Sequence, residues 1–160
     1  MYFGHCIGLA QQFCYCGSWS RRGHTCPIAN VGRSQTDARE LRTRLNLDAL
    51  ARIANRAGLR ATALRDLTLE QFRAELRKTN DPSLRYTINF TRQPLFGRGG
   101  GHHSPVGGYV EDLDLVFVLD VNERFRPWLV PSARLFAAID TTDPDSGKKR
   151  GLAVVEPRAP

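Results

Sequence analysis

Apolar residues recur at helical spacing in two stretches of the first half of the chain. Asn46 is a suitable N-terminal cap for the first helix, and Gly58 is a suitable stop about three turns later. The apolar residues that share one face of this helix are Leu47, Leu50, Ala51 and Ala54. A second helix is predicted to begin after Thr68, because Thr68 and Gln71 have the spacing of a capping box and an apolar stripe follows them. Between the two helices, residues 59–64 are predicted to form a short strand.

The second half of the chain has the pattern of strands. Residues 84–91 alternate between apolar and polar side chains, which is typical of a strand with one buried face. Residues 103–110 and 113–121 are predicted to pair antiparallel across an acidic turn, and residues 152–156 to form the last strand. A short helix is expected over residues 132–139. Helices followed by an antiparallel sheet define an α+β fold class.

Composition favours one globular domain. The chain has 160 residues and is 41% apolar, which is enough to form a core without disulfides. The net charge is +7, but no run of five or six like charges occurs, so a tail that binds nucleic acid is not indicated. No signal-peptide pattern is present at the start, and no stretch approaches the ~18 apolar residues of a membrane span. We therefore expect a cytoplasmic protein that binds neither nucleic acid nor a membrane.

All four cysteines lie near the start of the chain. Cys6, Cys14, Cys16 and Cys26 fall within the first 26 residues, whereas a disulfide framework usually joins distant parts of a small secreted fold. Reduced thiols are therefore the better interpretation. The spacing of these cysteines with His24 matches no standard zinc site, so we expect no resident metal.

A thiol nucleophile needs an imidazole beside it and a third polar group that orients the imidazole. His102 follows the glycine-rich segment 96–101, where Gly101 would allow a substrate to approach the backbone closely. Asp120 lies in the apolar run 116–121, and a carboxylate buried there needs a partner. His102 is a natural partner across the hairpin. Composition alone leaves two other interpretations open, namely a solvated glycine turn and a core carboxylate with a purely structural role.

Three segments together resemble the catalytic half of phytochelatin synthases. They are residues 101–109 (Gly-His-His-Ser-Pro-Val-Gly-Gly-Tyr), 118–121 (Val-Leu-Asp-Val) and 128–131 (Trp-Leu-Val-Pro). The resemblance implies a papain-like cysteine peptidase fold. It also implies that His102 is the general base and that Asp120, 18 residues later, is its orienting carboxylate. We expect a single domain over residues 1–160, in which 45–156 match clearly and 1–35 match poorly.

The same resemblance suggests a nucleophile without deciding between two cysteines. Residues 15–20 (Tyr-Cys-Gly-Ser-Trp-Ser) resemble the nucleophile segment of the family, which favours Cys16, and Gln12 lies upstream where the family has a glutamine of the oxyanion hole. Cys16 precedes His102 by 86 residues and Cys6 precedes it by 96, so Cys6 comes somewhat nearer to the longer spacing of the family. Arg124, shortly after the aspartate, is the candidate for gripping a substrate carboxylate.

The implied reaction is acyl transfer from glutathione. A cysteine thiolate would release glycine and form a γ-glutamylcysteinyl thioester, which then passes to water or to a second glutathione, the step that makes phytochelatins for heavy-metal detoxification. No cofactor is needed for this chemistry, and cadmium or zinc would enter as a thiolate complex with the substrate. The sequence is also compatible with a homodimer. The alternative function is a catalytically inactive, thiol-rich relative that binds metal.

Overall fold

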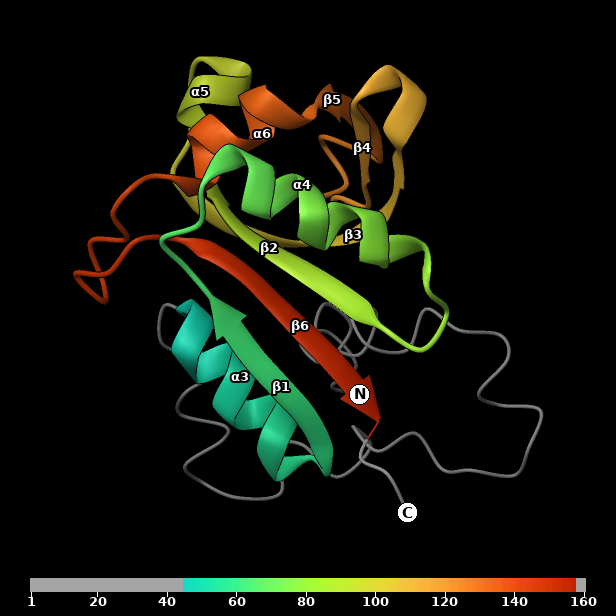
Figure 1. The fold of residues 1–160 in the computed structure, drawn as a ribbon. Helices are drawn as coiled ribbons and strands as arrows, with labels where there is room; N and C mark the ends of the chain where they lie inside the picture. Colours follow the sequence, from blue (N-terminus) through green and yellow to red (C-terminus); the bar gives the residue numbers. More distant parts are fainter. Residues whose placement is uncertain (1–44, 158–160) are drawn as a thin grey trace, which may run out of the picture.

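The strands of the chain form one antiparallel sheet that is covered by helices on both faces (Figure 1). The computed structural model describes residues 45–157. Within them the sheet has six strands in the order β1-β6-β2-β3-β4-β5, and each neighbouring pair is antiparallel. The strands are β1 (Leu59–Leu64), β2 (Arg85–Thr91), β3 (Gly101–Val110), β4 (Leu115–Val118), β5 (Trp128–Pro131) and β6 (Gly151–Pro157). The predicted α+β class is confirmed.

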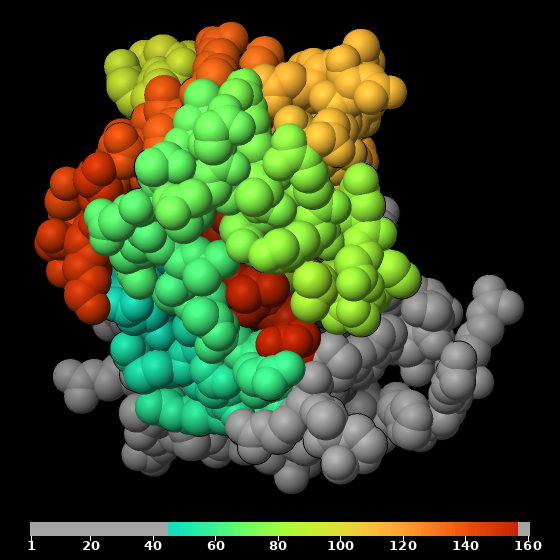
Figure 2. Space-filling view, viewed as in Figure 1, coloured from blue at the N-terminus to red at the C-terminus, as the bar shows by residue number. Residues whose placement is uncertain are grey.

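The helices divide between the two faces of the sheet. They are α3 (Leu47–Arg56), α4 (Leu69–Arg77), the one-turn α5 (Gln93–Phe96) and α6 (Ser132–Ile139), with 3-10 turns η3 (Lys78–Asn80) and η4 (Glu111–Leu113). The main core lies where α4 and α6 pack on strands β2 to β5, and α3 packs on the other face against β1 and β6. Leu152 of β6 faces the main core and its neighbour Ala153 faces α3, so β6 is buried on both sides. From the side of α4, only a strip of β6 reaches the surface between α4 and β1 (Figure 2).

Local capping positions the helices as the sequence predicts. The Asn46 side chain accepts a hydrogen bond from the Ala49 amide at 2.9 Å, and α3 begins at the next residue. Thr68 and Gln71 form the reciprocal capping box at the start of α4. Gly58 follows α3 with a φ of 85°, a conformation that favours glycine. These predictions from local sequence are confirmed.

Two of the predicted elements differ in the structure. Residues 86–90 of β2 are buried on both faces, so the expectation of a half-buried strand is wrong. The fourth strand ends at Val118, three residues before the predicted end at residue 121, and its pairing with β3 contains a register shift between Val106 and Gly108. Asp120 therefore lies two residues beyond the strand in which it was expected. Strand β5 and helix α5 were not predicted, since four residues are too few for a period to be recognised.

Gly151 permits the closest backbone approach in the described sheet. A Cβ at this position would lie 2.1 Å from the carbonyl oxygen of Leu64, whereas a Cβ at Gly100 would meet nothing within 4 Å. We predict that Gly151→Ala lowers the free energy of unfolding by about 1–3 kcal/mol, because β1 and β6 must separate to admit the methyl group. Urea denaturation measures the change, with Gly100→Ala as the matched control. Equal effects of the two substitutions would contradict the prediction.

Candidate active site

The carboxylate of Asp120 is fully buried and meets four donors or charges. Arg92, at the end of β2, donates to both oxygens, from Nη1 to Oδ2 at 2.8 Å and from Nη2 to Oδ1 at 2.9 Å. Trp128 Nε1, at the start of β5, donates to Oδ2 at 3.1 Å, and the backbone amide of Asn122 donates to Oδ1 at 2.9 Å. The fourth contact is His102. The carboxylate thus fixes the ends of three strands relative to one another.

His102 lies beside Asp120 at the start of β3. Its Nε2 is 3.3 Å from Asp120 Oδ1, within ion-pair distance, although among the described residues it has no well-aligned hydrogen-bond partner. The ring also meets Phe90 edge-on, with centroids 5.8 Å apart. The side chain of His102 is 24% exposed while that of Asp120 is 0% exposed. An imidazole with one buried side and one open side suits proton transfer to a bound molecule.

Electrostatics keep Asp120 ionised. Burial by itself raises the pKa of this carboxyl, but the contacts with His102, Arg92, the Asn122 amide and Trp128 together outweigh it. The pKa of Asp120 is therefore well below its usual range. An ionised carboxylate 3.3 Å from the ring nitrogen orients the His102 ring.

Arg92 is the residue of this site that sequence reasoning missed. Its guanidinium lies 3.9 Å from the ring centroid of Phe125, and 5.5 Å and 5.9 Å from those of Phe90 and Phe96. Arg92 is only 5% exposed. No local pattern distinguishes it from other arginines, because its partner Asp120 lies 28 residues away in sequence. The only available signal was the rule that a buried carboxylate needs a cation.

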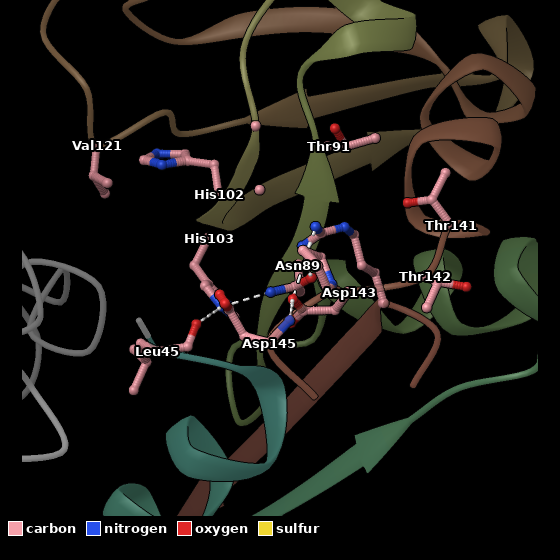
Figure 3. Close-up of a pocket in the computed structure, with 14 residues that line it drawn as sticks. Leu45, Asn89, Thr91, His102, His103, Val121, Thr141, Thr142, Asp143 and Asp145 are labelled. Carbon is pink, nitrogen blue, oxygen red and sulfur yellow. Dashed lines mark hydrogen bonds and ion pairs between the residues drawn. The ribbon is translucent and has the colours of Figure 1, made fainter. Parts of the chain in front are cut away.

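A pocket of about 780 Å³ opens beside His102 (Figure 3). The described residues in its wall include Gly101, His102, His103, Asn89, Asp143 and Arg150. The guanidinium of Arg150 reaches across the sheet to Gly101, where a Cβ would lie only 2.5 Å from Nη1. Glycine at position 101 therefore leaves room for the arginine, and its predicted role in admitting a substrate stays a prediction.

A row of polar contacts forms the floor of this pocket. The Nε2 of His103 lies 2.6 Å from Asn89 Nδ2 and 2.8 Å from the carbonyl oxygen of Leu45. The Oδ1 of Asn89 accepts a hydrogen bond from Arg150 Nη1 at 2.9 Å, and Arg150 Nη2 lies 3.9 Å from Asp143 Oδ1. Burial lowers the pKa of His103 to about 4, so this ring is neutral near pH 7.

The remaining predicted site residues have different outcomes. Cys6, Cys16 and Gln12 lie outside the described residues. Arg124 is exposed in the loop after Asp120, with its backbone amide bonded to the Asn122 side chain, and it is not among the described residues that line the pocket. Its role in gripping a substrate stays a prediction, as do the catalytic roles of His102 and Asp120.

Two further features concern residues 45–157 as a whole. In this part of the chain, no group of three or more His, Cys, Asp and Glu side chains is arranged to hold a metal ion. No helix of the same part is long and apolar enough to cross a membrane.

The described residues thus form an α+β domain that sets an imidazole against a buried carboxylate beside a pocket, an arrangement that is compatible with the base half of a nucleophilic triad. Comparison with known families then identifies the family. A family model described as Phytochelatin synthase matches residues 29–152. The chain belongs to the phytochelatin synthase family.

Similar proteins in other organisms bear one name. A wheat (Triticum aestivum) protein named glutathione gamma-glutamylcysteinyltransferase 1 is 34% identical over 67% of this chain and 22% of its own length. The Schizosaccharomyces pombe protein named glutathione gamma-glutamylcysteinyltransferase is 28% identical over 88% of this chain and 34% of its own length. The chain thus spans only a fifth to a third of these relatives. Among solved structures, the peptidase domain of Streptococcus ComA has a TM-score of 0.49 and 14% identity, covering 83% of this chain and 86% of that one.

The buried pair of Arg92 and Asp120 should dominate stability at this end of the sheet. We predict that Arg92→Met lowers the free energy of unfolding by about 3–5 kcal/mol, because it leaves Asp120 buried without its main cation. Arg77→Met is the matched control, since Arg77 pairs with Glu111 at 2.5 Å where both side chains are about half exposed, and its effect on the free energy of unfolding should be much smaller. Urea titration of both variants measures the difference, and similar losses would refute it.

The low pKa of His103 predicts that the folded protein loses stability as the pH falls from 6.5 to 4. Below its ordinary pKa of 6.5, the imidazole takes up a proton in the unfolded chain, whereas in the folded chain it stays neutral until about pH 4. The unfolded state then binds more protons, so the free energy of unfolding should fall by about 2 kcal/mol between pH 6.5 and pH 4 from this group. In His103→Gln this part of the decrease in the free energy of unfolding with falling pH should disappear. Denaturation curves across that range test it, and identical slopes for the two proteins would exclude it.

Proposed function

We propose that the chain supplies the catalytic domain of a glutathione γ-glutamylcysteinyltransferase that acts through a cysteine thioester. The observation that supports this most is the contact of His102 with the permanently ionised Asp120 at the edge of the pocket. Family membership and the names of its relatives agree with it. The activity is proposed for this chain because the relatives are several times longer.

The reaction has two acyl transfers. In the first, a cysteine thiolate paired with protonated His102 attacks the carbonyl carbon of the Cys-Gly bond of glutathione, and the carbonyl electrons move to oxygen. Collapse of this intermediate breaks the C–N bond, and His102 gives its proton to the departing glycine amine. In the second, neutral His102 removes a proton from water or from the amine of another glutathione as this nucleophile attacks the carbonyl carbon of the thioester, and collapse of the resulting intermediate breaks the C–S bond and returns the cysteine thiolate. Water yields γ-glutamylcysteine, and glutathione yields a peptide longer by one γ-glutamylcysteine unit.

Asp120 and Arg92 act on these two reaction steps through His102. Asp120 keeps the ring oriented toward the thiolate, because its carboxylate oxygen lies 3.3 Å from His102 Nε2. Arg92 contacts Asp120 and not the open pocket, so it is a positioning residue.

Substrate recognition fits the charges in the pocket wall. Arg150 and Asp143 present one positive and one negative group, 3.9 Å apart at their nearest atoms and both nearly buried. The γ-glutamyl end of glutathione carries one carboxylate and one ammonium, which would pair with these two groups. Gly101 leaves room for the peptide beside His102, and Arg124 is proposed to meet a second carboxylate from the loop. Cadmium or zinc would arrive bound to the substrate thiol, with no cofactor resident in the protein.

Glycine release from glutathione tests the proposal. We predict that the full chain releases glycine, and that Cys16→Ser stops release while Cys6→Ser does not, with the reverse pattern naming Cys6 as the nucleophile. His102→Asn should slow release by at least about a hundredfold, the usual contribution of a general acid and base. Mass spectrometry of the acid-quenched protein should detect one γ-glutamylcysteinyl group on the nucleophile.

Several outcomes would count against this function. Circular dichroism of each variant is the control that separates loss of activity from unfolding. If folded wild type releases no glycine, with or without cadmium or zinc, the transferase proposal fails and the inactive, thiol-rich alternative is favoured. Full activity in both serine variants would also exclude a mechanism through Cys16 or Cys6.

A further inference from the structure

The two consecutive histidines face opposite sides of β3. Neighbouring side chains of a strand point to opposite faces, and here His102 lies against Phe90 and Asp120 while His103 lies against its cross-strand partner Asn89. Figure 3 shows the two rings directed apart from the same strand. The mechanism proposed above uses only His102, which leaves a nearly buried imidazole in the pocket floor without a role.

The neighbour of His103 has only one workable orientation. Arg150 is a donor at every nitrogen, so the Asn89 atom that it meets at 2.9 Å must be the amide oxygen. The amide nitrogen of Asn89 then faces His103 Nε2 at 2.6 Å. Two donors at that distance would repel each other, so Nε2 must carry a lone pair and accept the Asn89 N–H. A neutral imidazole with its proton on Nδ1 meets this requirement.

We propose that His103 is a positioning residue which, as the Nδ1-protonated neutral ring, fixes the Asn89 amide and through it holds Arg150 over Gly101. The proposal rests on the function proposed above, in which Arg150 receives the substrate carboxylate. The row runs from His103 in β3 through Asn89 in β2 to Arg150, which directly precedes β6, and each member is held by the next. Without an acceptor at the position of Nε2, the Asn89 amide can rotate, and Arg150 loses the hydrogen bond that aims it at the pocket.

The contact with Leu45 offers a competing position for the His103 proton, which makes the proposal testable. The Leu45 carbonyl also lies near Nε2, at 2.8 Å, and it can be satisfied by this ring only if the proton sits on Nε2. One nitrogen cannot serve the amide donor and the carbonyl acceptor at once. The proposal therefore places the proton on Nδ1, and the competing arrangement places it on Nε2.

Nitrogen NMR of the full chain at pH 7 separates the two arrangements without any need for activity. The expected spectrum has the His103 proton on Nδ1 and an unprotonated Nε2 that is coupled to the Asn89 amide. A proton on Nε2 would overturn the proposal. During a glutathione titration, the Arg150 Nε–H signal should move in wild type, which shows that this arginine meets the ligand, and an unmoved signal would argue against its role.

Two substitutions of similar polarity give the kinetic test. A glutamine oxygen replaces Nε2 in position, whereas an asparagine oxygen replaces Nδ1, so His103→Gln keeps the acceptor and His103→Asn removes it. We expect KM for glutathione to rise about tenfold in His103→Asn with little change in kcat, and to stay within about twofold of wild type in His103→Gln. Equal KM values in the two folded variants, or a loss confined to kcat, would overturn the inference. Absence of turnover in wild type would instead count against the proposed function, and the NMR result would still decide the position of the proton.

Discussion

The central constraint in this domain is the burial of the Asp120 carboxylate. A charge without solvent must be met by protein groups, and those groups come from the ends of β2, β3 and β5 and from the loop after β4. No single one of these segments is regular enough to fix its own end. Satisfying one carboxylate therefore fixes four segments at once, and the orientation of His102 follows from the packing of the sheet.

Because Asp120 is buried, Arg92 is needed to neutralise its charge. Its guanidinium is enclosed by the rings of Phe90, Phe96 and Phe125 and makes two hydrogen bonds to Asp120. Arg92 does not line the pocket, so it is not placed to meet a substrate anion, whereas Arg150 does line it. In the proposed function, Arg92 therefore stabilises Asp120 while Arg150 receives the substrate carboxylate.

Local signals in the sequence predicted the parts of the fold that depend on local physics. The cap at Asn46 and the box at Thr68 each involve residues within one turn, so both could be seen in the sequence. His102 and Asp120 were found because a glycine loop and an apolar strand draw attention to polar residues. The bond of Asn89 to Arg150 spans 61 residues, and neither side chain follows a period that would reveal it. Such contacts become visible only when the order of the strands is known.

The pair His102-His103 illustrates why the sequence alone could not distinguish the two imidazoles. They have the same chemistry and adjacent positions, but the alternation of a strand sends one to the buried carboxylate and the other to a neutral amide. A carboxylate lies beside His102, whereas the burial of His103 lowers its pKa to about 4. His102 thus has a charged neighbour, while the His103 ring is neutral near pH 7. Exchanging their roles would require β3 to slip by one residue, and that slip would also turn the buried side chains of Ser104 and Val106, which share the face of His102, to the opposite face of the sheet.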